Sequence, residues 1–119
     1  MNLYWCETAD HDEDWFVVAS SAREACRFHE KEEGYGTRDA RATLVCCIPR
    51  TLAVRKGWPS RDLLLALGAV FLSDSTPRVV EIRSTVYQEG GMDAVINRLS
   101  DDYSEAVGME RLNKTTRLQ

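Results

Sequence analysis

The sequence has no apolar run long enough to cross a bilayer, and its first residues lack the pattern expected of a secretory leader. Its longest apolar stretch, residues 63–72, is interrupted by Gly68 and falls short of the ~20 residues that a membrane helix needs. A basic region followed by an apolar one, the pattern of a secretory signal, is missing from the first residues. We therefore expect a cytoplasmic protein without membrane contact, in which the four cysteines remain free thiols.

The common catalytic and cofactor motifs are absent as well. The sequence contains no phosphate-binding glycine loop, no G-x-S-x-G turn, no H-E-x-x-H helix and no C-x-x-C pair. With only two histidines, His11 and His29, an acid–base site built on imidazole has few possible members. These absences favour a non-enzymatic protein and predict no catalytic residue, no metal and no cofactor.

Composition and charge indicate one globular domain whose surface carries separate acidic and basic regions. The 119 residues are 44% hydrophobic and 29% charged, and the net charge of −4 argues against direct nucleic-acid binding. The charge is uneven: residues 1–40 hold 10 acids and 4 bases, residues 41–80 hold 2 and 6, and residues 81–119 hold 7 and 5. Such an arrangement suits the orientation of a protein partner, and the alternative is that the segments attract one another within the fold.

The clearest local pattern is a capping box at Ser21 and Glu24. The hydroxyl and the carboxylate of such a pair satisfy free backbone N–H groups at a helix start, and Gly34 is a natural helix end. The sequence therefore predicts a helix over residues 21–33. Gly68 likewise ends a short helix predicted over residues 61–67, and an apolar stripe at helical spacing predicts a third helix over residues 92–107.

Strands are expected where β-branched and aromatic residues cluster between turn residues. We predict an antiparallel hairpin of residues 3–8 and 15–19, a strand over 41–48, a strand over 78–82, and a continuation or partner over 85–87; residues 69–72 are interpreted as a turn. The resulting fold class is α+β, with a mainly antiparallel or mixed sheet and about three helices packed chiefly on one face. The domain is expected to span residues 1–112, followed by a frayed tail over 113–119.

Five consecutive ionisable residues, 10–14, lie in the expected hairpin connection. Alternating aspartates with a histidine resemble metal ligands, but the glycine and the distal bidentate glutamate of a calcium loop are missing. The remaining interpretations are a solvated turn and an acidic surface for a partner. On the second interpretation, the partner-binding residues are Asp10, Asp12, Glu13, Asp14, Glu30, Glu32 and Glu33.

Two further groups of residues suggest chemistry. Cys26 and His29 are three apart on the first predicted helix, as a thiol–imidazole pair would be, but their position on the apolar stripe favours core packing. A basic loop surrounds an aromatic residue and forms a second candidate surface, which could grip single-stranded nucleic acid. Its members are Arg50, Arg55, Lys56, Trp58 and Arg61.

The stretch Asp14 to Ala19, followed by Ser21 to Ala25 and by Phe28 to Tyr35, resembles small uncharacterised bacterial and phage-borne proteins. Small acidic proteins of mobile elements include inhibitors of host defence such as anti-CRISPR proteins, which occlude a nucleic-acid-binding surface. The resemblance rests on structural motifs, size and charge, so it transfers no site residue to this chain.

These observations predict a non-enzymatic protein-binding module, an inhibitor or regulator of a host nucleic-acid-handling complex that acts through an acidic surface. The alternatives are a small metal-dependent hydrolase that uses the acidic loop with His11 or His29, and a nucleic-acid binder that uses the basic loop. An exposed edge at residues 41–48 could also pair across a two-fold axis to form a homodimer.

Overall fold

Strand β1 (Asn2–Thr8) is the centre of the first sheet. The structure, a computed structural model that describes residues 1–90, pairs it antiparallel with β2 (Trp15–Ala19) on one side and β3 (Ala40–Cys47) on the other. The predicted hairpin is confirmed, with Trp5 opposite Phe16. The predicted strand at 41–48 is also confirmed, and β3 lies at an edge of its sheet.

Helix α1 (Ala22–Glu33) covers one face of this sheet and begins and ends as predicted. The Ser21 hydroxyl accepts a hydrogen bond from the Glu24 N–H at 3.1 Å, and Gly34 ends the helix with φ 77°. The Glu24 carboxylate accepts from the N–H of Ser20 at 2.7 Å, one residue before the cap. Beneath the helix, Tyr4, Cys6, Val17 and Ala19 of the sheet are buried against Ala25 of α1.

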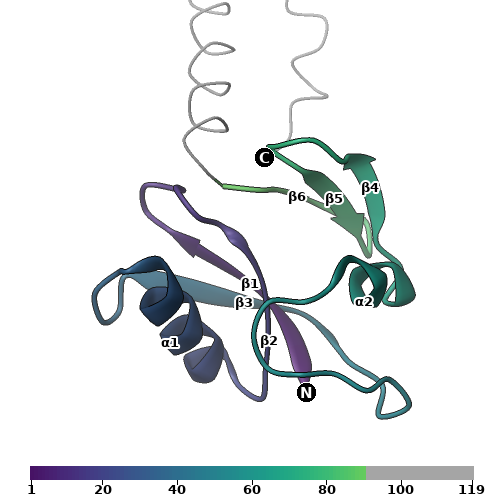
Figure 1. Cartoon of the computed structure of the whole chain (residues 1–119), viewed down its shortest axis with the longest axis horizontal. Coiled ribbons are helices and arrows are strands. Elements are labelled where there is room, and N and C mark those ends of the chain that lie inside the picture. The colour runs from purple at the N-terminus through teal and green to yellow at the C-terminus, as the bar shows by residue number, and fades with distance from the viewer. Residues whose placement is uncertain (91–119) are drawn as a thin grey trace, which may run out of the picture.

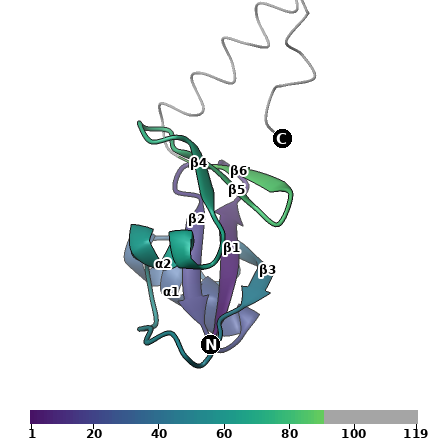
Figure 2. The ribbon, with the colours of Figure 1, turned by 90° about the vertical axis from the view of Figure 1, so that its right-hand side faces the viewer.

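The other face of the first sheet packs against helix α2 (Arg61–Ala66) and a second sheet (Figures 1 and 2). Successive strand residues point to opposite faces, so a strand covered on both sides is apolar throughout, as β2 is. The core on this side combines residues of both sheets and of α2: Leu3, Trp5, Trp15, Phe16, Val18, Cys46, Ile48, Leu64, Ala69, Val80 and Ile82.

The second sheet contains β4 (Val70–Ser73), β5 (Val79–Ile82) and β6 (Thr85–Gln88), all antiparallel in the order β4-β5-β6. β5 and β6 pair across Arg83 and Ser84, both of which have positive φ. The interpretation of residues 69–72 as a turn is wrong. Gly68, with φ 96°, follows the end of α2, and the chain then continues into β4, where Val70 and Phe71 pair with β5.

The α+β class is confirmed, with two antiparallel three-stranded sheets in place of a single sheet. The two described helices lie on opposite faces of the first sheet, so the expectation that helices gather on one face is wrong for residues 1–90. The third predicted helix, over 92–107, and the tail over 113–119 lie outside the described residues. Within residues 1–90, the helices are too short and too polar to span a membrane.

Candidate functional site

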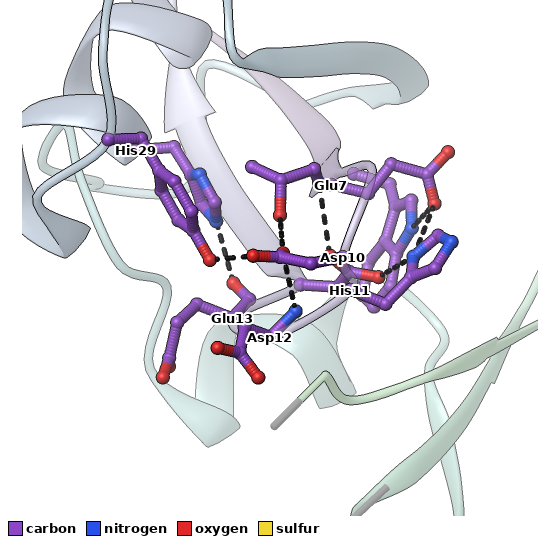
Figure 3. A network of polar contacts seen from close by, with 10 residues as sticks. Glu7, Asp10, His11, Asp12, Glu13 and His29 are labelled. Atoms are coloured by element: carbon purple, nitrogen blue, oxygen red, sulfur yellow. Dashed lines mark hydrogen bonds and ion pairs between the residues drawn. The ribbon is translucent and has the colours of Figure 1, made fainter. Parts of the chain in front are cut away.

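The acidic loop, residues 9–14, connects β1 to β2 and is held by its own side chains (Figure 3). The Asp10 carboxylate accepts hydrogen bonds from the Thr8 hydroxyl at 2.6 Å and from the Asp12 N–H at 3.0 Å. These two bonds lower the pKa of Asp10 below its ordinary value. His11 adopts φ 55°, which turns the chain, and its backbone N–H donates to the Thr8 carbonyl. The loop is therefore an ordered turn.

Asp14 points inward from this loop and is only 4% exposed. Its Oδ1 accepts from the Thr8 N–H at 3.2 Å, and its Oδ2 lies 2.6 Å from Nδ1 of His11. Burial raises the pKa of Asp14, and the bond to His11 opposes that shift in part. Asp14 was predicted to contact a partner, but its burial gives it a structural role inside the loop instead.

Helix α1 holds the other end of the loop through His29. The fully buried imidazole donates from Nε2 to the main-chain carbonyl of Glu13 at 2.6 Å (Figure 3). Its ring stacks on Tyr35, with centroids 5.9 Å apart and planes at 5°, and the Tyr35 hydroxyl donates to Asp10. The burial of His29 agrees with the predicted core packing. Burial also raises the pKa of the Cys26 thiol, so that thiol is not an activated nucleophile.

This anchoring brings carboxylates from two elements together. Glu13, from the loop, and Glu33, from the last turn of α1, line the same groove. Partial burial raises the pKa of Glu13, and the nearby charges of Glu33 and Asp12 raise it further. We call Asp10, Asp12, Glu13 and Glu33 the acidic face. The sequence had grouped the loop carboxylates with those at the end of the first helix, and in the structure Glu33 lies beside Glu13.

A groove of about 290 Å³ borders the acidic face. Glu13 and Glu33 line it together with Trp58, Pro59 and Arg78. Trp58 is 40% exposed, and its indole packs edge-on against Phe28 and His29, with ring centroids 4.9 and 6.0 Å apart. The groove lining also includes Asp14, Trp15 and Glu89, so it combines several carboxylates and one guanidinium with a large, positioned aromatic ring. The sequence had placed Trp58 in a separate basic surface.

The remaining acidic candidates differ in accessibility. Glu30 is 7% exposed, and its carboxylate accepts from the N–H of Ala40 at 3.0 Å, which ties α1 to the start of β3. Glu30 is therefore a structural residue rather than a surface contact. Glu32 is exposed on the same helix.

In the basic loop, two of the four cations have carboxylate partners. Lys56 Nζ lies 2.6 Å from Glu24 of α1, and Arg61 lies 2.6 Å from Asp74 and stacks on the Phe71 ring. Arg50 and Arg55 are exposed. The pair of Lys56 with Glu24 supports the interpretation in which oppositely charged segments attract one another within the fold, whereas Arg61 and Asp74 belong to the same segment. Both pairs reduce the positive charge available to a nucleic acid.

Glu7, His11 and Asp14 form a third cluster of polar side chains. The Glu7 carboxylate lies 3.9 Å from His11 Nδ1, and ligand atoms of Glu7, His11 and Asp14 all lie within 4.8 Å of one another. Glu7 and His11 also line a cavity of about 550 Å³ with Arg38 and Arg41. Sequence reasoning missed Glu7 because it counted ligands only within the acidic run, whereas Glu7 precedes that run on β1.

Comparison of the chain with protein-family models, with curated proteins and with solved structures found no match in any of the three. The function is therefore argued from the geometry of the site alone.

Proposed function

We propose that this protein is a non-enzymatic protein-binding module that holds a basic partner through the acidic face and its groove. The observation that carries the proposal is the meeting of Glu13 and Glu33 beside the exposed ring of Trp58. Two adjacent carboxylates favour a guanidinium or ammonium group between them, since a cation relieves their mutual repulsion. An indole face adds a cation–π contact to the same group.

The geometry also favours a protein partner that presents an arginine or lysine side chain. The groove volume of about 290 Å³ accommodates one long basic side chain, while Asp10 and Asp12 extend the negative charge along the loop. Basic side chains of this kind line nucleic-acid-binding surfaces. Occupation of such a surface would block nucleic acid, which is the action expected of an inhibitor or regulator of a host nucleic-acid-handling complex.

The order of the loop supports binding because its residues lose little freedom on association. Thr8, Tyr35 and His29 already hold Asp10 and Glu13 in place through the bonds described above. A surface that is arranged before binding avoids part of the entropy cost that weakens flexible interfaces. The same bonds fix the spacing between the loop and the end of α1.

Affinity capture from the native host with three forms of the full chain tests this proposal. The forms are the wild type, the variant Asp12→Lys/Glu13→Lys/Glu33→Lys, and a control in which the exposed Asp62 and Asp74 become lysine. We expect one basic protein to be retained by the wild type and by the control and lost by the triple variant. Equal retention of every captured protein by all three forms would overturn the proposal.

A further inference from the structure

We propose that Glu7, His11 and Asp14 form a binding site for a divalent transition-metal ion of the zinc class. None of the three belongs to the acidic face, although Asp14 also lines the groove beside it. The three side chains offer one imidazole nitrogen and two carboxylate oxygens, all within 4.8 Å of one another. Nitrogen and oxygen donors of these types bind Zn²⁺ at ~2.0–2.2 Å, and three protein ligands with an open fourth position are typical of non-structural zinc sites. The mixed donor set favours Zn²⁺ over Mg²⁺ or Ca²⁺, which prefer oxygen ligands alone.

The distances require only small movements of exposed side chains. Two ligands of one tetrahedral zinc ion lie ~3.4 Å apart, and the observed separations from His11 Nδ1 are 2.6 Å to Asp14 and 3.9 Å to Glu7. His11 and Glu7 are partly exposed and can adjust, while Asp14 is fixed. On binding, Nδ1 of His11 would coordinate the ion in its unprotonated form, so the neutral imidazole would carry its proton on Nε2.

Groups behind two of the three ligands already orient them. The Trp5 indole N–H donates to Oε1 of Glu7 at 3.4 Å, and the Thr8 N–H donates to Oδ1 of Asp14 at 3.2 Å. Such outer contacts orient ligands in metal sites. In Glu7, the oxygen that Trp5 holds, Oε1, is also the one that lies 3.9 Å from His11 Nδ1, whereas in Asp14 the bond from Thr8 leaves Oδ2 free for the ion. In Asp14, this free oxygen is the one that faces His11.

The surroundings of the three ligands leave one coordination position of the ion open to a cavity. Glu7 and His11 line the cavity of about 550 Å³, whose wall also includes Arg38, Asp39 and Arg41. This cavity leaves room for water at the open position of the ion. The buried Asp14 carboxylate beside Glu7 remains the concentrated negative charge that a cation would neutralise.

Calorimetric titration of the full chain, stripped of metal, with ZnCl₂ tests the site. We expect saturable binding of one ion, with the affinity reduced at least ~10-fold by Glu7→Gln and by His11→Asn. Asparagine tolerates the positive φ of His11, so this variant removes the imidazole with little backbone strain. The matched control Asp12→Asn removes a charge from the same loop and is expected to bind as the wild type does.

Titration with Co²⁺ separates this site from the cysteines, because thiolate ligation gives an intense near-ultraviolet absorption band that nitrogen and oxygen ligation lack. We expect the wild type and Cys47→Ser to bind equally and without that band. Thermal unfolding of each variant without metal identifies any that fails to fold. Absence of saturable Zn²⁺ binding by the wild type, equal loss in the Asp12→Asn control, or loss of binding in Cys47→Ser would each overturn the proposal.

Discussion

The buried imidazole of His29 donates from Nε2 to the carbonyl oxygen of Glu13 across 2.6 Å, and this bond joins helix α1 to the acidic loop. The two residues are 16 apart in sequence. Because Glu33 lies one helical turn beyond His29, the bond also sets the distance between the Glu13 and Glu33 carboxylates. The acidic face therefore depends on a buried residue that no partner would touch.

Replacement of His29 tests this dependence. His29→Phe keeps a ring but leaves the Glu13 carbonyl without its donor, so we expect a loss of about 1–3 kcal/mol in the free energy of unfolding, measured by urea denaturation. His29→Gln, whose amide can still donate, serves as the control and should lose less. Equal stability of the Phe variant and the wild type would show that the bond contributes nothing.

Gly90 is packed against the acidic loop so closely that no side chain fits. Its N–H donates to the Asp14 carbonyl at 3.0 Å, and an added Cβ would lie 2.6 Å from the His11 carbonyl oxygen and closer still to the Asp14 nitrogen. We expect Gly90→Ala to lower the melting temperature by several degrees, since backbone atoms must move. Gly36→Ala, whose Cβ would meet only the flexible Asp39 side chain, should melt near the wild type; a similar fall in both variants would argue against the clash.

The ion pair between Glu89 and Arg78 should make part of the free energy of unfolding depend on pH. Burial alone would raise the pKa of Glu89, but hydrogen bonds from the Arg78 side chain and N–H, at 2.9–3.0 Å, together with the Arg78 charge, lower it below its ordinary value. A carboxylate with a lowered pKa stabilises the fold fully above its unfolded pKa, and this contribution disappears as the pH falls through the folded value.

Glu89→Gln should therefore destabilise the protein at pH 7 by about 1–3 kcal/mol, and the difference from the wild type should shrink below pH 4.5. Chemical denaturation at a series of pH values measures both quantities. Glu81→Gln, on neighbouring β5, provides the control. A difference that stays constant down to pH 2 would contradict the assigned pair.

Lys56 and Glu24 connect the basic loop to helix α1 at the surface. The hydrogen bond from Lys56 lowers the pKa of Glu24 most, followed by bonds from Ser20, to a value of about 2. We expect the side-chain carboxyl carbon of Glu24, followed by NMR, to titrate near that value. Lys56→Met should raise the pKa toward its ordinary range, whereas Arg55→Met should leave it unchanged; an unshifted pKa in the Lys56 variant would exclude the pair.

Local patterns in the sequence predicted the elements that short-range contacts determine. Ser21 and Gly34 set the ends of α1 through hydrogen bonds within a few residues, so both ends could be predicted from the sequence. Residues 70–73 become a strand only because β5 lies beside them, a contact that no local pattern encodes.

The candidate site could be predicted only in part for the same reason. The charges at residues 10–14 and 30–33 were visible, but the burial of Asp14 and Glu30 depends on the packing of the loop and of β3 against α1. The position of Trp58 beside Glu13 and Glu33 requires the loop after β3 to run back along β2. Paired hydrogen bonds between Val18 and Gly57 hold it there.

The affinity of the captured partner for Glu13→Gln/Glu33→Gln, compared with the wild type, tests the central claim most directly. These substitutions remove both charges and keep the side-chain shapes, and Asp62→Asn/Asp74→Asn removes two charges elsewhere. We expect the first variant to bind at least ~10-fold more weakly, with a smaller dependence on salt, and the second to bind within ~2-fold of the wild type. Wild-type affinity in the Glu13→Gln/Glu33→Gln variant would contradict the claim that the acidic face holds the partner.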